Sequence, residues 1–167
     1  MPLISNGRLT DDPWAAVADD EALPATGPVI VSLDRWQADR GALLARGGLL
    51  GVRLASHQLA AEIADDLAHF DLVALEFPSF RDGRAYSTAR LLRERHGFAG
   101  ELRAVGNVLY DQFMFMHRCG FDAFEVADDR PAEAWRRAMD EISVWYQPAS
   151  DGRIPVTALR HFRSAAE

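Results

Sequence analysis

Residues 71–107, DLVALEFPSFRDGRAYSTARLLRERHGFAGELRAVGN, carry the pattern that decides the fold. The segment starts with a short apolar run at 71–78 and ends with another at 101–107, and each is typical of a buried strand. Between them, residues 86–97 have the composition of a helix. Two strands joined by a helix pair in parallel through a right-handed crossover. The stretch therefore predicts a strand–helix–strand unit.

The same alternation extends in both directions along the chain. We expect further strands at 29–33, 49–55 and 121–126, with a possible sixth at 143–149. The expected helices are a first one opened by Asp34 and ended by Gly47-Gly48, then 56–70 capped by Ser56, 109–120, and 130–142 with Pro131 near its first position. This predicts an α/β domain of five to six mostly parallel strands alternating with helices. We prefer an open doubly wound sheet, and a partial (β/α) barrel-like arrangement is the alternative.

The rest of the chain is divided by composition. Residues 1–27 form an acidic N-terminal arm, in which PLISNGRL predicts a hairpin or edge strand turning at Asn6-Gly7. Residues 28–149 form the α/β domain, and residues 150–167 a C-terminal tail of loop and frayed end. The 167 residues suit one domain with a substantial core.

The composition excludes several classes of protein. The net charge of −7 argues against nucleic acid as the main partner. No run of apolar residues is long enough to span a membrane and the N-terminus lacks a signal-peptide pattern, so we expect a cytoplasmic protein. The single cysteine and the five scattered histidines give no metal signature, and no nucleotide or flavin motif is present, so we expect no metal and no cofactor. No catalytic residue can be assigned.

The loop after the 71–78 strand is the unusual feature of the chain. Residues 77–108 contain six arginines against three acidic residues, although all 18 basic residues of the chain are arginine and reflect a general bias. Ligands approach parallel sheets at the carboxyl ends of the strands. There, Arg81 and Arg84 beside a helix start capped by Ser87 or Thr88 could hold an anion. The alternative for Arg84 is a structural salt bridge.

Other polar residues of this region have simpler interpretations. Arg90 lies four residues before Glu94, and we expect Arg90, Arg93 and Arg95 to form a solvated helix face. Tyr86 is either a packed tyrosine or a general acid, and Asn107 is expected to cap the next helix. Arg103 either pairs with Glu76 on the neighbouring strand or points to a rim. The candidate anion- or partner-binding residues are Arg81, Asp82, Gly83, Arg84, Tyr86, Ser87, Arg90, Arg103, Asn107, Asp111, Gln112 and Arg118.

Three blocks within residues 77–126, F.DGR.YS.ARLLR, GELRAVG.VL.DQ and RCGFDAFE, resemble a known family. It is the bacterial domain-of-unknown-function family DUF 934, which is encoded beside assimilatory sulfite reductase and is sometimes labelled a probable oxidoreductase. A looser resemblance extends over most of residues 28–148. Asn107 stands where the family often has an aspartate, which weakens any role that needs a carboxylate there. Beyond the candidates above, the resemblance implies functional positions at Phe77, Pro78, Gly106, Cys119, Gly120 and Asp122.

The resemblance and the residues together give three hypotheses. The first is an accessory protein of assimilatory sulfite reduction, which binds the sulfite reductase haem subunit or its electron donor. The second is an enzyme or sensor that binds a small anion in the strand-end cleft around Arg84, in a pocket bounded by Ser56, Ser87 and Asn107. The third is a flavin-dependent oxidoreductase.

Overall fold

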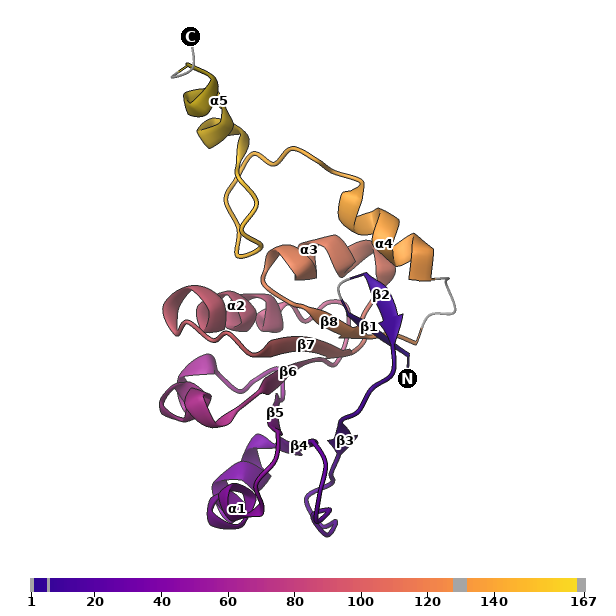
Figure 1. Cartoon of the computed structure of the whole chain (residues 1–167), viewed down its shortest axis with the longest axis vertical. Helices are drawn as coiled ribbons and strands as arrows, with labels where there is room; N and C mark the ends of the chain where they lie inside the picture. Colours follow the sequence, from indigo (N-terminus) through magenta and orange to yellow (C-terminus); the bar gives the residue numbers. More distant parts are fainter. Residues whose placement is uncertain (1, 6, 128–131, 165–167) are drawn as a thin grey trace.

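Eight strands form one mixed sheet in the order β2-β1-β8-β7-β6-β5-β4-β3 (Figure 1). The computed structural model describes residues 2–5, 7–127 and 132–164. From β3 to β8 all neighbouring strands are parallel, whereas β1 is antiparallel to both β2 and β8. The strands are β1 Leu3–Ser5, β2 Arg8–Thr10, β3 Ala15–Ala16, β4 Val29–Ser32, β5 Leu50–Leu54, β6 Leu72–Phe77, β7 Glu101–Gly106 and β8 Ala123–Glu125.

Helical segments connect the strands from β4 to β8 and continue beyond β8. The 3₁₀ segments are η1 and η3, and η2 is a π-helical turn that continues α2. The segments are α1 Leu33–Arg46, η1 Ala60–His69, α2 Arg84–Arg90, η2 Leu91–Arg95, η3 Tyr110–Gln112, α3 Phe113–Arg118, α4 Ala132–Asp140 and α5 Val156–Ser164. Among the described helices, none combines the length and the apolar character needed to cross a membrane.

The strand order identifies which of the two expected architectures forms. The mixed α/β class and the open sheet of mainly parallel strands are confirmed. The strands β4 to β8 lie side by side in chain order, however, and a doubly wound sheet would reverse direction part-way. Successive right-handed crossovers in one direction place the helices on one face. The sheet is therefore a half-barrel, which matches the barrel-like alternative (Figure 1).

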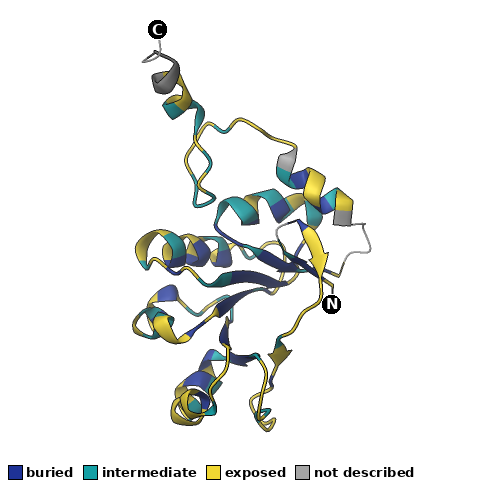
Figure 2. Cartoon of the chain, viewed as in Figure 1, coloured by how far each residue is buried: buried dark blue, intermediate teal, exposed yellow. Residues whose placement is uncertain are grey.

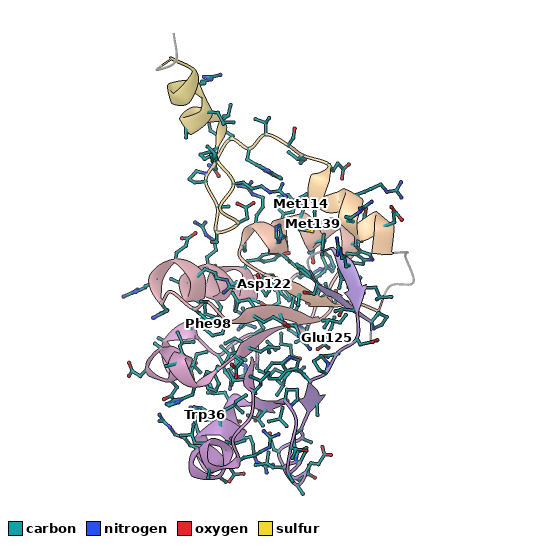
Figure 3. All side chains as sticks on the ribbon, viewed as in Figure 1. Trp36, Phe98, Met114, Asp122, Glu125 and Met139 are labelled. Carbon is teal, nitrogen blue, oxygen red and sulfur yellow. The ribbon has the colours of Figure 1, made fainter. Side chains whose placement is uncertain are left out.

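The two faces of the sheet are buried in different ways. Side chains that alternate along the strands, such as Val31, Val52 and Leu75, point to the helical face and join the main core. Trp36 of α1 is buried in this core, and its indole Nε1 donates to Asp66 at 2.8 Å (Figure 3). The opposite, concave face has a small apolar cluster of four residues against which Trp14 packs. Figure 2 shows the central strands coloured as buried.

An arginine is buried on the concave face. Arg103 of β7 has no exposed surface, and its guanidinium lies 2.8 Å from Glu101, 2.7 Å from Asp12 and 3.5 Å from Glu125. Burial lowers the pKa of Arg103, but the hydrogen bond with Asp12 and the charge of Glu101 outweigh it and raise the pKa above its ordinary value. Arg103 thus attaches the N-terminal arm to the sheet. Both alternatives for Arg103 were wrong, because Glu76 binds Arg53 at 2.9 Å instead and Arg103 is fully buried rather than at a rim.

A second arginine joins several segments on the helical face. Arg93 of η2 is half-buried and donates to the carbonyl oxygens of Phe98, Gly100 and Gly120, and it forms an ion pair with Asp122 (Figure 3). Asp122 also accepts the backbone N–H of Leu102 at 2.9 Å. The prediction that Arg93 belongs to a solvated helix face was wrong. Its side chain joins the end of η2 to the starts of β7 and β8.

Several boundaries differ from those that the sequence predicted. The N-terminal hairpin is confirmed, although Asn6 of its expected turn and Pro131 lie outside the described residues. Residues 143–149 form no strand, and the tail contains α5 rather than loop alone. The expected caps were also wrong. The Ser32 side chain caps α1 instead of Asp34, and Ser87 lies inside α2, which begins after Gly83. The segments η1 and η3 begin after Leu59 and Leu109 rather than after Ser56 and Asn107.

Candidate functional site

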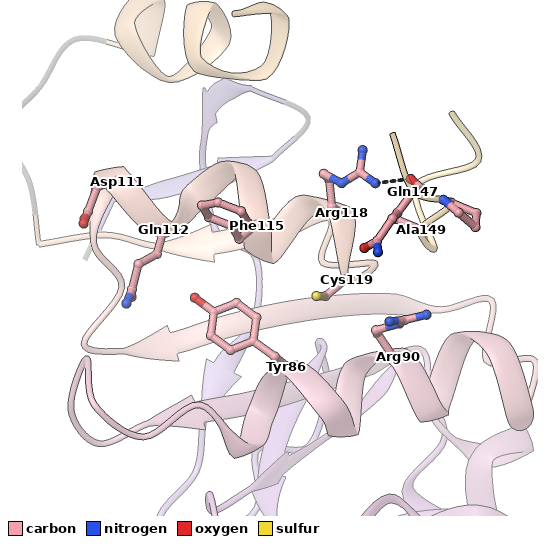
Figure 4. A pocket seen from close by; sticks show the side chains of 10 residues that line it. Tyr86, Arg90, Asp111, Gln112, Phe115, Arg118, Cys119, Gln147 and Ala149 are labelled. Carbon is pink, nitrogen blue, oxygen red and sulfur yellow. Dashed lines mark hydrogen bonds between the residues drawn. The ribbon is translucent and has the colours of Figure 1, made fainter. Parts of the chain in front are cut away.

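A cavity of about 550 Å³ lies between α2 and α3 (Figure 4). On α2, Tyr86 and Arg90 are four residues apart and therefore share one face. The spacing of four recurs in Asp111, Phe115 and Cys119 on the η3–α3 segment. We call this space the α2–α3 cavity, and its volume is in the range of small-ligand sites. Its lining residues are Tyr86, Arg90, Asp111, Gln112, Phe115, Arg118, Cys119, Gln147, Pro148 and Ala149.

One wall of the cavity comes from the C-terminal part of the chain. Residues 145–151, which we call the strap, lie against the end of α3. Arg118 donates to the carbonyl of Gln147 at 2.7 Å, and its guanidinium carbon lies 3.8 Å from the centroid of the Trp145 ring. The backbone N–H of Ser150 donates to the carbonyl of Arg118 at 3.0 Å. The side chain of Arg118 therefore holds the strap and is not directed at the cavity (Figure 4).

The arginine on α2 is also engaged. Arg90 donates to both carboxylate oxygens of Glu94, at 2.9 and 3.1 Å. Glu94 accepts a further hydrogen bond from the hydroxyl of Ser150 at 2.7 Å. The Ser150 hydroxyl and then Arg90 lower the pKa of Glu94, so the pair remains ionised. The expected Arg90–Glu94 pair is thus confirmed.

The middle of the cavity holds two weak acids that stay protonated at neutral pH. Burial, with smaller contributions from Cys119 and Asp111, raises the pKa of Tyr86 to about 12. Burial also raises the pKa of the Cys119 thiol. Neither group is a nucleophile in this state, because the thiolate and phenolate are the reactive forms. The cavity therefore offers a phenol hydroxyl and a thiol for contact and no activated base or nucleophile.

A second, smaller cavity of about 350 Å³ lies between η1 and α2. Ser56, Arg84 and Ser87 line it, as the anion hypothesis expected, together with Arg95 and His96, but Asn107 does not. Arg84, however, donates to both oxygens of Asp82, at 2.9 and 2.6 Å, and to Ser56 at 2.9 Å. The Arg84 side chain holds the pKa of Asp82 far below its usual range, and Asp82 in turn raises the pKa of Arg84. The guanidinium already has an anionic partner within its own loop.

The predicted site residues are therefore divided among separate places. Tyr86, Arg90, Asp111, Gln112 and Arg118 meet at the α2–α3 cavity, and Arg84 and Ser87 at the smaller one. Gly83 caps α2, and Asp82 pairs with Arg84. Arg81 stacks on Phe80 with its guanidinium carbon 5.7 Å from the ring centroid, and Asn107 is exposed at the end of β7. Arg103 lies on the concave face, remote from both cavities.

Sequence reasoning missed part of the larger cavity. Phe115 belongs to the apolar run FMFM at 113–116, yet it is 64% exposed, whereas Phe113 two residues earlier is fully buried. A helical wheel of residues 113–116 places Phe113 and Phe115 on different faces, and it could have separated the buried ring from the exposed one. The sequence of the strap did not indicate that it lines the cavity, because its position depends on contacts with Arg118. Within the described parts of the chain, no group of three or more histidine, cysteine, aspartate or glutamate side chains is arranged to hold a metal ion.

The fold and cavities define a class: a half-barrel α/β domain with two ligand-sized cavities between the helical segments of one face. The family model for a bacterial protein of unknown function, DUF934, matches residues 51–157, and the chain belongs to this family. The match covers β5 to the start of α5 and so includes both cavities and the strap. No curated protein matches the chain. No solved structure matches it either.

Proposed function

We propose that the chain is an accessory protein of assimilatory sulfite reduction that binds the sulfite reductase haem subunit or its electron donor. The pathway follows from the resemblance of residues 77–126. The observation that supports a binding role is the set of exposed apolar side chains on the C-terminal arm, residues 141–160. Clustered exposed apolar side chains mark interaction sites. Those of the arm are Ile142, Val144, Tyr146, Ile154 and Leu159, of which Tyr146 is 75% exposed.

The chemistry of the larger cavity supports binding rather than catalysis. Tyr86 and Cys119 are protonated at neutral pH, and Arg90 and Arg118 are engaged with Glu94 and the strap. An enzyme of acyl or phosphoryl transfer needs an activated nucleophile or free charge at the reacting centre. An accessory protein needs a surface that a partner can cover, and the C-terminal arm provides it.

The direct test is co-elution of the full chain with the purified haem subunit and, separately, with its electron donor. We expect a complex in size-exclusion chromatography at micromolar concentration and low salt. Tyr146→Ala should weaken it, because the change removes the most exposed ring of the arm. Leu9→Ala is the matched control, since Leu9 is 59% exposed on the N-terminal hairpin. Independent elution from both candidates would contradict the proposal.

A genetic test addresses the pathway without assuming a partner. A strain that lacks the gene should grow with cysteine and grow poorly with sulfate as the sulfur source. Re-expression of the full chain should restore growth on sulfate, and the Tyr146→Ala variant should restore it less well. Unimpaired growth of the deletion strain on sulfate would count against a role in sulfite reduction.

A second candidate function, small-anion binding, is favoured by the meeting of Ser56, Arg84 and Ser87 in one cavity. An anion there competes with Asp82 for the Arg84 guanidinium, so any affinity should be weak. Thermal-shift series with millimolar sulfite, sulfate and phosphate test this function. Stabilisation that is lost in Arg84→Ala supports it, and the same shift in the variant contradicts it.

A further inference from the structure

The charges around the α2–α3 cavity are not balanced. Its two cations face carboxylates already, because Arg90 binds Glu94 and the guanidinium of Arg118 lies 3.8 Å from Asp151 of the strap. Asp111 is exposed and, among the described residues, has neither a hydrogen-bond nor an ion-pair partner. The free charge of the cavity is therefore negative.

Aromatic rings accompany this carboxylate. Tyr86 and Phe115 line the same cavity, and Figure 4 shows Asp111 and Gln112 toward one end with Tyr86 and Phe115 next to them. The negative charge of Asp111 is close enough to Tyr86 to contribute to its raised pKa. A carboxylate beside aromatic faces attracts a cation through both charge and the ring quadrupole.

We propose that the α2–α3 cavity receives a lysine or arginine side chain presented by a partner protein, with its charged head at Asp111 and its stem against Phe115 and Tyr86. This inference deepens the proposed function and rests on it. Long basic side chains place an apolar stem on hydrophobic surface and keep the charged head near polar groups. A cavity with apolar walls and one free carboxylate matches that chemistry.

Two wider features favour a protein partner with a basic surface. The chain has a net charge of −7, and an acidic protein attracts a basic patch at long range. The cavity also adjoins the apolar arm, because Gln147 and Pro148 line it directly after the exposed Tyr146. A partner that covers Tyr146 would lie at the mouth of the cavity. The basic side chain would then be one anchor of a larger interface.

The cavity can be tested without the partner by NMR titration of the ¹⁵N-labelled full chain. The probes are Nα-acetyl-arginine and Nα-acetyl-lysine N-methylamides, with the norleucine analogue as an uncharged match of the stem. We expect saturable shifts of the amides of Tyr86, Asp111 and Phe115 with the basic probes only. Equal shifts with the norleucine probe, or binding of Nα-acetyl-glutamate N-methylamide instead, would overturn the inference.

Variants identify the carboxylate responsible. Asp111→Asn should weaken binding of the arginine probe by about tenfold, because it removes one charge-assisted hydrogen bond. Phe115→Ala should weaken it several-fold and is tolerated by the fold because the ring is exposed. Asp65→Asn is the matched control, since Asp65 is an exposed carboxylate of η1 that lines neither cavity. Equal affinity in Asp111→Asn and Asp65→Asn would overturn the inference.

The two levels of the proposal can fail separately. If the haem subunit or the donor co-elutes with the chain but no basic probe binds, the inference about the cavity is wrong and the proposed function stands. If the arginine probe binds at Asp111 but neither candidate partner co-elutes, the cavity has the stated specificity and the proposed function is wrong.

Discussion

At the scale of single residues, the arginines of residues 77–108 mainly form ion pairs and hydrogen bonds within the domain. Four of the six form ion pairs with carboxylates: Arg84, Arg90, Arg93 and Arg103. Arg93 and Arg103 reach across the fold, to Asp122 and to Asp12. A bidentate guanidinium suits such contacts because it fixes direction as well as charge. The local excess of positive charge is thus neutralised largely within the domain.

The Asp82–Arg84 pair predicts an unusual titration. The folded-state pKa of Asp82 is lowered, so its contribution to stability is complete at neutral pH and is lost as the pH falls below ~4 toward the folded pKa. In an NMR titration of side-chain carboxyl carbons, Asp82 should remain ionised at pH values where a carboxyl with the ordinary aspartate pKa protonates. In Arg84→Ala its midpoint should move up to the ordinary range. An unchanged midpoint in the variant would show that Arg84 is not the cause.

Arg103 should be the most sensitive charged residue of the sheet. Arg103→Met leaves Asp12, Glu101 and Glu125 close together without their cation, which typically costs about 3–5 kcal/mol. The free energy of unfolding in urea measures the loss. Arg81→Met is the control, because Arg81 is exposed and should change stability by no more than about 0.5 kcal/mol. Similar losses in both variants would argue against a structural role for the buried cluster.

At the scale of elements, the end of β7 depends on a glycine. Gly106 has φ of 90°, and a Cβ there would lie 2.5 Å from the carbonyl oxygen of Phe77. Gly106→Ala should lower the free energy of unfolding by more than Gly27→Ala, which has φ of 89° and open space around it. The control should lose about 1–2 kcal/mol from its backbone conformation alone. Equal losses in urea unfolding would show that the close approach to Phe77 is easily relieved.

The sequence pattern predicted the central strands well, because a buried strand is marked by the apolar residues of its own segment. The apolar runs at 71–78 and 101–107 correspond to β6 and β7 within one residue at each end. The predictions failed where contacts between distant segments determine the local structure. Residues 143–149 have strand-like composition, but Trp145 stacks on Arg118 and lies in the strap. After Ser56 the Gln58 side chain accepts the N–H of Ala55, and this turn delays η1 to Ala60.

The candidate site was predictable only in part, for a similar reason. Tyr86, Arg90 and Asp111 could be found because they lie on consecutive helical segments near one edge of the sheet. Whether an arginine is free to bind a ligand depends on whether a carboxylate lies beside it in the fold. That carboxylate can come from any part of the sequence. Arg103 and its partner Asp12 are 91 residues apart, and Arg93 and Asp122 are 29 apart. No pattern in a single sequence indicates those pairs.

At the scale of the whole molecule, the acidic charge sets how a partner approaches. A complex between this chain and a basic surface should form more slowly as salt rises, because screening removes long-range attraction. Between ~50 mM and ~500 mM salt we expect the association rate to fall about tenfold or more. Stopped-flow mixing of the chain with its co-eluting partner measures this rate. A rate that is constant or increases with salt would contradict a basic partner surface.

The N-terminal segment reaches both borders of the sheet, with β1 beside β8 and β3 beside β4. During synthesis on the ribosome, β1 emerges first, yet its neighbour Ala123–Glu125 emerges some 120 residues later. The nascent chain must therefore carry the hairpin of β1 and β2 without its neighbour β8 until the last parallel strand has appeared. The central unit of β4 to β8 should consequently assemble before the N-terminal hairpin pairs with it.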